Sequence, residues 1–154
     1  MFQRFRTPGE GEKLILEHNV FVEKVLPGSI LRQLTEEEMN AYRAPFLTPA
    51  SRIPTWRLPN ELPIAGNPED VYTLIENAHR ALFSSRYPKL LFSADPGVLT
   101  PPAVADDYAS RLHHCKHVRL GRGAHYLQED HPERIGIEIA AWITAQEHTE
   151  SDRV

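Results

Sequence analysis

His125 is the residue whose type and position best fit catalysis in this sequence. It stands in the loop 123–130, after a strand predicted over 115–120 and ahead of a helix that begins at 130–132. In open α/β sheets, ligands and catalytic groups gather at the carboxyl ends of parallel strands. A histidine in such a loop can act as a general base near neutral pH. The alternative interpretation is a surface loop histidine without a chemical role.

Asp95 is a second candidate for the same chemistry. It follows a short buried strand predicted over 89–92, and a carboxylate in that place could hold the imidazole of His125 in one tautomer. Asp before Pro-Gly is also common turn chemistry, so the alternative interpretation of 95–97 is a turn that breaks the strand.

A metal site is the other chemistry to consider. Four residues offer imidazole or thiolate groups within a short stretch: His113, His114, Cys115 and His117. Ligands split between a helix end and a strand start rarely converge on one tetrahedral zinc, and no second cluster accompanies them. The acidic run 36–38 is interpreted as a helix N-terminus stabilised by the helix dipole. We therefore predict no metal and no cofactor.

The elements that position these residues follow from periodicity and from turn and capping signals. Thr35 and Glu38 form a capping box that opens a short helix through residue 42, and Asn67 and Pro68 are predicted as N-cap and first residue of another helix. The predicted helices cover 10–26, 35–42, 68–84, 103–114 and a final one from 132, in which Ile135, Ile139, Trp142 and Ile143 mark a buried stripe; strands cover 89–92 and 115–120; 121–123 is a turn. The proline-rich stretch 44–67 is expected to be mostly irregular.

The order from residue 68 onward is helix, strand, helix, strand, loop and helix, which is typical of a parallel sheet covered by helices. Two strands are too few for such a sheet, because its faces need cover and its edge strands need neighbours. We therefore expect an α/β fold that is incomplete, with the missing strands placed before Met1.

Composition and net charge argue against nucleic acid and membranes as binding partners. The chain has 154 residues and a formal net charge of -4, so it offers no basic field for nucleic acid or anionic lipid. No apolar run approaches the roughly 20 residues of a membrane span. Cys115 alone permits no internal disulfide, and a cytoplasmic location is the expected default.

Four stretches together resemble one known family. They are 34–47, 56–66, 88–92 with 96–99 and, most specifically, 123–132 followed by 135–140, which looks like the C-terminal signature of haloalkane dehalogenases. The resemblance implies the C-terminal portion of an α/β-hydrolase fold, with the N-terminal half of the sheet absent. Residues 1–67 would form a helical cap-like segment, and 68–154 would carry the last two parallel strands and their flanking helices.

The resemblance also implies a reaction. In this family an aspartate displaces halide from a small halogenated alkane, and a water activated by histidine then hydrolyses the alkyl-enzyme ester. His125 matches the base, whereas the acid that orients it lies upstream in the subgroup that this chain most resembles and at the position of Asp95 in many other α/β-hydrolases. Eight positions match the apolar substrate cavity: Phe2, Phe5, Phe21, Val25, Pro59, Leu62, Val98 and Leu99. Ordinary core packing would explain the same residue types.

The family's nucleophile motif, an Asp followed by a halide-binding Trp, does not occur in these 154 residues, and neither Trp56 nor Trp142 can be assigned to halide binding. We therefore expect a truncated form without activity by itself. The alternative is a non-catalytic fragment or interaction module that self-associates through an exposed sheet edge. Without a complete core, Phe2, Phe5, Phe21 and Trp56 are expected to face solvent.

Overall fold

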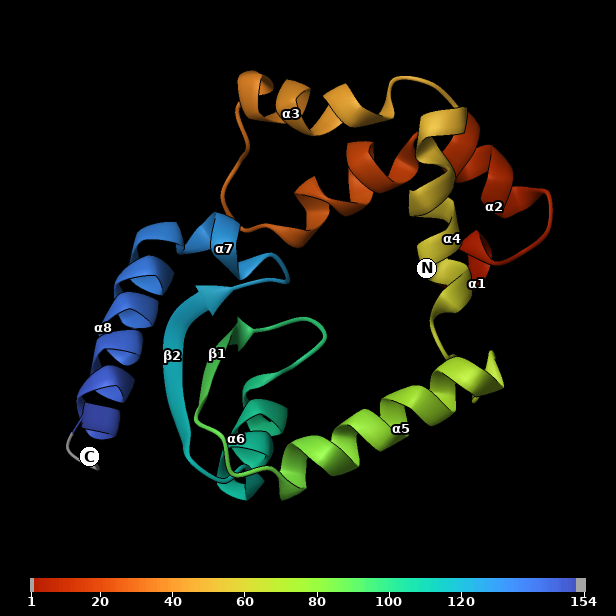
Figure 1. Cartoon of the computed structure of the whole chain (residues 1–154). Coiled ribbons are helices and arrows are strands. Elements are labelled where there is room, and N and C mark those ends of the chain that lie inside the picture. Colours follow the sequence, from red (N-terminus) through yellow and green to blue (C-terminus); the bar gives the residue numbers. More distant parts are fainter. Residues whose placement is uncertain (1, 152–154) are drawn as a thin grey trace. The chain divides into compact units, whose positions relative to one another are not determined.

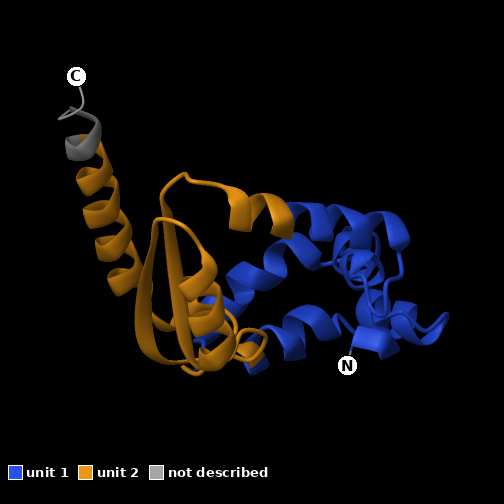
Figure 2. Ribbon diagram, turned by 90° about the horizontal axis from the view of Figure 1, so that it is seen from below, with its two compact units in different colours: residues 1–28, 33–78 blue, residues 29–32, 79–154 orange. Residues whose placement is uncertain are grey.

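The computed structural model describes residues 2–151 and divides the chain into two compact units (Figures 1 and 2). Unit 1 consists of Met1–Gly28 and Gln33–Ala78, and unit 2 consists of Ser29–Arg32 and His79–Val154. The division predicted at residue 67, between a cap-like and a core segment, remains a prediction.

Unit 1 is built from short helical segments. Its elements are α1 (Phe2–Phe5), α2 (Glu10–Glu12), η1 (Lys13–Glu17), η2 (Phe21–Val25), η3 (Pro27–Ser29, whose last residue belongs to unit 2), α3 (Glu36–Arg43), η4 (Ala44–Phe46), η5 (Ala50–Arg52), α4 (Ile53–Glu61) and the first part of α5 (Glu69–Ser84). The capping box at α3 is confirmed, because Thr35 Oγ1 accepts the Glu38 N–H at 3.2 Å and Glu38 Oε2 accepts the Thr35 N–H at 2.7 Å.

The single helix predicted over 10–26 is wrong. The chain instead forms α2 and the two π-helical segments η1 and η2, which are separated at Asn19. Asn19 adopts a φ of 51°, a left-handed conformation that asparagine tolerates better than most residues and that a continuous helix does not allow. Of the four apolar residues that carry the helical spacing, Val25 is buried and Leu14, Val20 and Phe21 are partly buried, and this spacing gives no sign of the break.

The irregular conformation predicted for 44–67 is also wrong in part. Residues 53–61 form α4, which carries Pro54 in its first turn, where a missing N–H removes no helical hydrogen bond. Pro59 lies inside the helix and is buried. The Asn60 side-chain amide donates to the Trp56 carbonyl at 2.7 Å. The start of α5 is one residue later than predicted, since Tyr72 N–H donates to the Pro68 carbonyl and the helix begins at Glu69.

The core of unit 1 corrects the expected exposure of its aromatic residues. Phe5 is only 3% exposed and forms the core cluster with Ile15 and Val25. Phe2, Phe21 and Trp56 are partly buried and pack against that cluster, with the Phe2 and Phe5 rings edge to face at 6.1 Å. These side chains therefore have apolar neighbours within unit 1.

Arginine side chains satisfy the carbonyls that the short helices of unit 1 leave unpaired. Arg52 donates to the carbonyls of Leu16, Glu17, Phe46 and Leu47 at 2.8 to 3.2 Å. Separately, the Arg6 guanidinium donates to the Leu62 and Asn67 carbonyls, both at 2.9 Å. Buried or partly buried carbonyls need such partners, and a guanidinium can supply several donors at once.

Unit 2 contains the parallel strands β1 (Lys89–Pro96) and β2 (Cys115–Gly123), joined through α6 (Pro102–Arg111). The C-terminal helices are α7 (Leu127–Asp130) and α8 (Pro132–Ser151). Alternate residues of a strand face opposite sides of its sheet. Lys116 of β2 pairs with Glu138 of α8, whereas Arg119 pairs with Asp106 of α6, so the two helices cover opposite faces.

Both strands are longer than predicted. The turn predicted at 121–123 is wrong, because these residues continue β2 to a register in which Asp95 pairs with Arg122 and Pro96 with Gly123. The register shifts between Ser93 and Asp95, where β2 holds one residue more than β1. Gly121 lies in this bulge with a φ of +94°, a conformation that glycine adopts without steric cost.

The stripe predicted as buried on α8 is largely open. Ile139 and Ile143 are 39% and 46% exposed, and Ile135 and Trp142 are only partly buried. On α5, Leu74 is 67% exposed. On α8 the physical reason is the size of the sheet, since the described residues form only the two strands β1 and β2 for this helix to cover. Between residues 2 and 151, no helix combines the length and apolar character that a bilayer crossing requires.

An ion pair in unit 1 predicts a pH-dependent stability. The Arg43 guanidinium donates to both Glu23 oxygens at 2.8 to 3.1 Å, which lowers the pKa of Glu23 from its ordinary value of 4.5. A carboxyl whose pKa is lowered by folding stabilises the folded state above its unfolded pKa, and this contribution disappears as the pH falls through the folded pKa. We expect Glu23→Gln to reduce amide protection across 21–43 at pH 7 but not near pH 3, as measured by hydrogen exchange.

The control for this prediction is Glu37→Gln at the exposed start of α3, which removes a carboxylate that does not pair with Arg43. It should change protection less than Glu23→Gln at pH 7. Equal protection of wild type and Glu23→Gln at pH 7 would contradict the stabilising role of the pair.

Candidate functional site

The His125 loop follows β2 at its carboxyl end, as predicted. The His125 and Tyr126 N–H groups both donate to the Ser29 carbonyl, at 2.9 and 3.1 Å. The imidazole lies against the Tyr126 ring with centroids 4.9 Å apart, and the His125 side chain is exposed. Burial raises the pKa of the Tyr126 hydroxyl above its ordinary value of 10.0. The backbone of the histidine is therefore fixed while its ring remains accessible.

Asp95 lies at the same end of the neighbouring strand. It belongs to β1 and pairs with Arg122 in the sheet, so its interpretation as a turn residue is wrong. The Gly97 N–H donates to the Gly123 carbonyl at 3.1 Å, which holds the ends of β1 and β2 together. Neither the Asp95 carboxylate nor the His125 imidazole makes a side-chain hydrogen bond or ion pair within residues 2–147. Their catalytic pairing stays a prediction.

The structure separates the residues matched to the substrate cavity into two groups. Phe2, Phe5, Phe21 and Val25 lie together in or against the core cluster of unit 1. Pro59 is fully buried in α4, and Leu62 follows that helix, partly buried. Val98 and Leu99 belong to unit 2 and are 55% and 62% exposed. Core packing explains Phe5 and Val25 fully, and a role in substrate binding remains a prediction for all eight positions.

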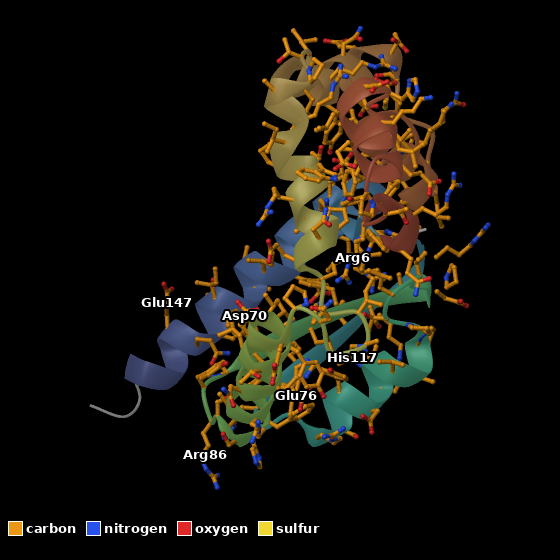
Figure 3. All side chains as sticks on the ribbon, turned by 90° about the vertical axis from the view of Figure 1, so that its right-hand side faces the viewer. Arg6, Asp70, Glu76, Arg86, His117 and Glu147 are labelled. Carbon is orange, nitrogen blue, oxygen red and sulfur yellow. The ribbon has the colours of Figure 1, made fainter. Side chains whose placement is uncertain are left out.

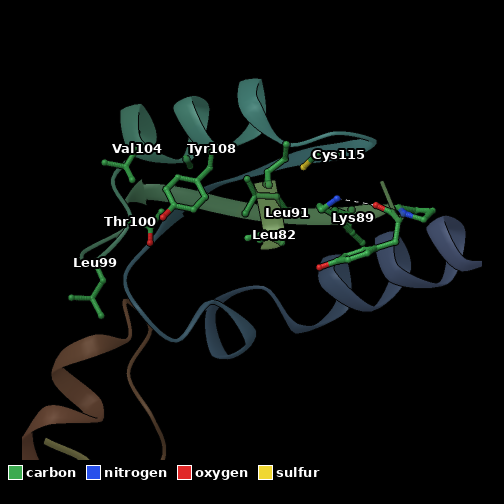
Figure 4. A pocket seen from close by; sticks show the side chains of 13 residues that line it. Leu82, Lys89, Leu91, Leu99, Thr100, Val104, Tyr108 and Cys115 are labelled. Carbon is green, nitrogen blue, oxygen red and sulfur yellow. Dashed lines mark hydrogen bonds between the residues drawn. The ribbon is translucent and has the colours of Figure 1, made fainter. Parts of the chain in front are cut away.

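Unit 2 contains an apolar cavity of about 590 Å³ between β1, α6 and the end of α5 (Figure 4). Its lining includes Leu82, Leu91, Leu99, Val104 and Tyr108. The Cys115 thiol also lines it, and burial raises the pKa of that thiol.

The lysine of this cavity is already engaged. All of its polar contacts are structural, because Lys89 Nζ donates to the carbonyls of Ser85, Tyr87 and His113 at 2.9 to 3.1 Å. An ammonium group has three donors, so these bonds use them all. Neither His125 nor Asp95 lines the cavity, so the predicted chemistry is not assigned to it, and apolar packing around β1 explains its lining.

The residues considered for zinc are dispersed. His113 and His114 lie in the turn between α6 and β2, and Cys115 begins β2. The His117 side chain instead lies between the strands and α6, with its Nε2 2.7 Å from Ser93 Oγ (Figure 3). Within the part of the chain that the structure describes, no group of three His, Cys, Asp or Glu residues is arranged to hold a metal ion.

Ser93, His117 and Asp106 form an arrangement that the sequence did not reveal. His117 Nδ1 lies 3.7 Å from Asp106 Oδ1, so the order Ser, His and Asp resembles that of a hydrolytic triad. Ser93 is only 6% exposed, however, and does not line the cavity beside β1. The 3.7 Å separation also exceeds a hydrogen bond. The group is therefore a polar link between β1, β2 and α6.

The sequence pattern also gave no sign of the contacts that hold the His125 loop. Asp130 lies inside the stretch 123–132 that carried the family resemblance, but its partners Leu31 and Arg32 are 99 and 98 residues away in the chain. Local periodicity carries no signal for contacts of that range.

Comparison with known proteins agrees with this geometry. No family model matches the chain. It is 56% identical over 147 residues to a haloalkane dehalogenase of Bradyrhizobium diazoefficiens, covering 96% of the chain and 47% of that protein. It is 57% identical to one of Mesorhizobium japonicum, covering 93% of the chain and 46% of that protein. A crystal structure of a loop variant of the haloalkane dehalogenase DbeA from Bradyrhizobium elkanii superposes with a TM-score of 0.97 at 58% identity, covering 99% of the chain and 50% of that structure.

The two parallel strands with their flanking helices are the C-terminal portion of an α/β-hydrolase fold. Within that class the chain resembles the haloalkane dehalogenases, and the resemblance found from its motifs is confirmed. The chain spans about half the length of the curated relatives it matches.

The close packing at Gly123 predicts that a larger side chain there destabilises the protein. A Cβ on Gly123 would lie 2.7 Å from Ala94 Cβ and 2.8 Å from Leu127 Cδ2, so the end of β2 must move to accept it. We expect Gly123→Ala to lower the free energy of unfolding by about 1–3 kcal/mol, in the range of overpacked sites. Urea denaturation followed by circular dichroism would measure the change.

Gly136→Ala in α8 is the matched control, because a Cβ there meets nothing within 4 Å. Alanine inside a helix should stabilise by about 0.5–1 kcal/mol relative to glycine. If both variants unfolded at the same urea concentration, the tight contact at Gly123 would not be limiting.

Proposed function

We propose that this chain supplies the His125-bearing half of a haloalkane dehalogenase-type hydrolase. The observation that carries the proposal is the placement of His125 directly after the second of two parallel strands, within a stretch 56% identical to a protein named haloalkane dehalogenase. An exposed imidazole on a backbone held by the Ser29 carbonyl suits a general base that must reach a water molecule.

The proposed reaction has two steps. A carboxylate displaces halide from a small halogenated alkane, which forms an alkyl ester and releases the halide ion. His125 then removes a proton from water while the water oxygen attacks the ester carbonyl. The acyl–oxygen bond breaks, the departing alkoxide takes the proton from His125 to leave as the alcohol, and the carboxyl group loses a proton to solvent, which regenerates the carboxylate. The proposal assigns the nucleophile to a partner half, because these 154 residues lack the Asp-Trp motif of the family. The chain is thus proposed as a truncated form, inactive by itself.

The remaining roles are proposed in the same frame. Residues 1–67 serve as a cap-like segment and 68–154 as part of the core, with a cytoplasmic location. The eight apolar positions named above would contact the alkyl group of the substrate, and Asp95 would orient His125. The role of Asp95 is supported by its position at the carboxyl end of β1, the strand beside the one that leads into the His125 loop.

The experiment is halide release from 1-bromobutane. The chain alone should release no more bromide than buffer. Co-expressed with the N-terminal half of the Bradyrhizobium diazoefficiens relative, it should release bromide, and His125→Ala should reduce the rate at least about 100-fold, the lower limit for loss of a general base.

His113→Ala is the control for this assay, since the His113 side chain is exposed in the turn before β2. It should leave the rate within about twofold, inside the range of ordinary surface substitutions. Turnover by the chain alone that His125→Ala abolished would contradict its proposed inactivity. A co-purified complex that released no bromide would contradict the proposed function.

A second candidate function is a non-catalytic module that self-associates through the open edge of its sheet. The observation that favours it is the pairing of β1 with β2 alone among the described strands, together with exposed apolar side chains such as Leu74 and Ile137, which is 69% exposed. Apolar surface of this kind is commonly covered by association.

Light scattering tests this alternative. Self-association predicts a mass above 17.6 kDa that rises with protein concentration. Addition of the N-terminal half should dissociate the assemblies if the same edge is used. A mass of one chain at all concentrations would exclude the module and leave the hydrolase proposal standing.

A further inference from the structure

The segment Ser29–Arg32, here called the strap, belongs to unit 2 although the residues on both sides of it belong to unit 1 (Figure 2). Its hydrogen-bond partners lie in the loop after β2 and in α7, and those of Leu31 and Arg32 are 97 to 99 residues further along the chain. Contacts between residues so far apart in the chain form only in the folded unit. The hydrogen bonds of the strap therefore show how the loop at 124–131 is held in place.

The strap fixes the backbone of the histidine itself. The Ser29 carbonyl accepts the N–H groups of His125 and Tyr126 at 2.9 and 3.1 Å. One carbonyl oxygen has two lone pairs and can accept both bonds. The peptide groups on either side of the His125 Cα are thereby tied to the strap, while the imidazole makes no bond to it.

The Asp130 carboxylate joins the strap to the residue before the histidine. Its Oδ1 accepts the N–H groups of Leu31 at 2.9 Å and Arg32 at 3.1 Å. Its Oδ2 accepts the Leu31 N–H at 3.2 Å and the Ala124 N–H at 3.4 Å. Bonds from amides to an ionised carboxylate are roughly twice as strong as bonds between neutral groups. Ala124 is buried, so its N–H has little access to water as an alternative acceptor.

Further contacts close the arrangement. Arg32 Nε donates to the Glu129 carbonyl at 2.7 Å, and its Nη2 pairs with Glu129 Oε2 at 2.6 Å. His131 Nε2 lies 2.6 Å from the Arg122 carbonyl, which links the start of the loop to its end. The loop is thus held by the strap from one side and by its own following residues from the other.

We propose that Asp130 is a positioning residue for His125, acting through the Ala124 amide and the strap rather than on the imidazole. The proposal rests on the proposed role of His125 as general base. Such a base must keep hydrogen-bond geometry toward its water, and misplacement by about 1 Å can cost about a hundredfold in rate. The carboxylate supplies acceptors for three amides at the point where the loop leaves β2, so it sets where the following residue lies.

The test uses the chain as it is and measures the loop directly. Amide hydrogen exchange by NMR at Ala124, His125 and Tyr126, together with the imidazole Cε1–H signal of His125, would be compared between wild type and two variants. Asp130→Ala removes every acceptor and should accelerate exchange at these amides at least tenfold and displace the Cε1–H signal. Asp130→Asn keeps one acceptor oxygen and should give a smaller change of both.

Asp107→Asn is the control, because it removes a carboxylate from unit 2 whose ion pair with Arg111 lies within α6. It should leave the His125 signal and the loop amides unchanged. In both Asp130 variants the amide of Val118 inside β2 should exchange within twofold of wild type, which separates positioning of the loop from a general loss of stability.

Two results would overturn the proposal. The first is an unchanged His125 signal and unchanged exchange at 124–126 in Asp130→Ala. The second is a parallel acceleration at Val118 and at the loop, which would make Asp130 a general stabiliser of unit 2. Neither readout depends on turnover, so failure of halide release would refute the proposed function without refuting the positioning role, and the reverse also holds.

Discussion

Parallel pairing of β1 with β2 is the constraint on which unit 2 depends. Parallel strands require a crossover between them, and here α6 provides it, so the strands end at the same edge of the sheet. The Gly97 to Gly123 hydrogen bond extends this pairing to the last residue of β2. Asp95 and the His125 loop consequently leave the sheet at one edge, and no separate interaction is needed to bring those two backbone positions there.

Cationic side chains then satisfy the backbone where regular structure ends. Arg52 and Arg6 donate to carbonyls of unit 1, and Lys89 donates to three carbonyls of unit 2. At the strap the charged side chain is an acceptor instead of a donor, because the Asp130 carboxylate accepts backbone N–H groups. Where these contacts are partly buried, as at the Leu62 carbonyl and the Ala124 N–H, a peptide group left without its partner would cost about 1–3 kcal/mol. Charged side chains therefore supply hydrogen-bond partners to the irregular segments of both units.

The open apolar stripes and the family resemblance have one physical explanation. Ile139 and Ile143 of α8 carry the spacing of a packed helix, yet they remain exposed in unit 2, whose sheet has only two strands among the described residues. The chain covers only 46–47% of the relatives that it matches at 56–57% identity, so those proteins are about twice as long. In unit 1 the aromatic residues Phe2, Phe5, Phe21 and Trp56 instead lie in or against the core cluster of that unit.

The sequence by itself determined the elements whose signals are local. The Thr35 and Glu38 capping box, the order of helices and strands after residue 68 and the motif around His125 all depend on neighbours within a few residues, and each predicted its element or its family correctly. Only the tertiary structure decided the extension of β2 through Gly121, the break at Asn19 and the formation of α4 through its prolines. The tertiary structure also decided that the Asp130 carboxylate accepts hydrogen bonds from the strap. Strand length and loop position depend on hydrogen-bond partners that lie far away in the chain, and residue periodicity carries no information about partners that only folding brings together.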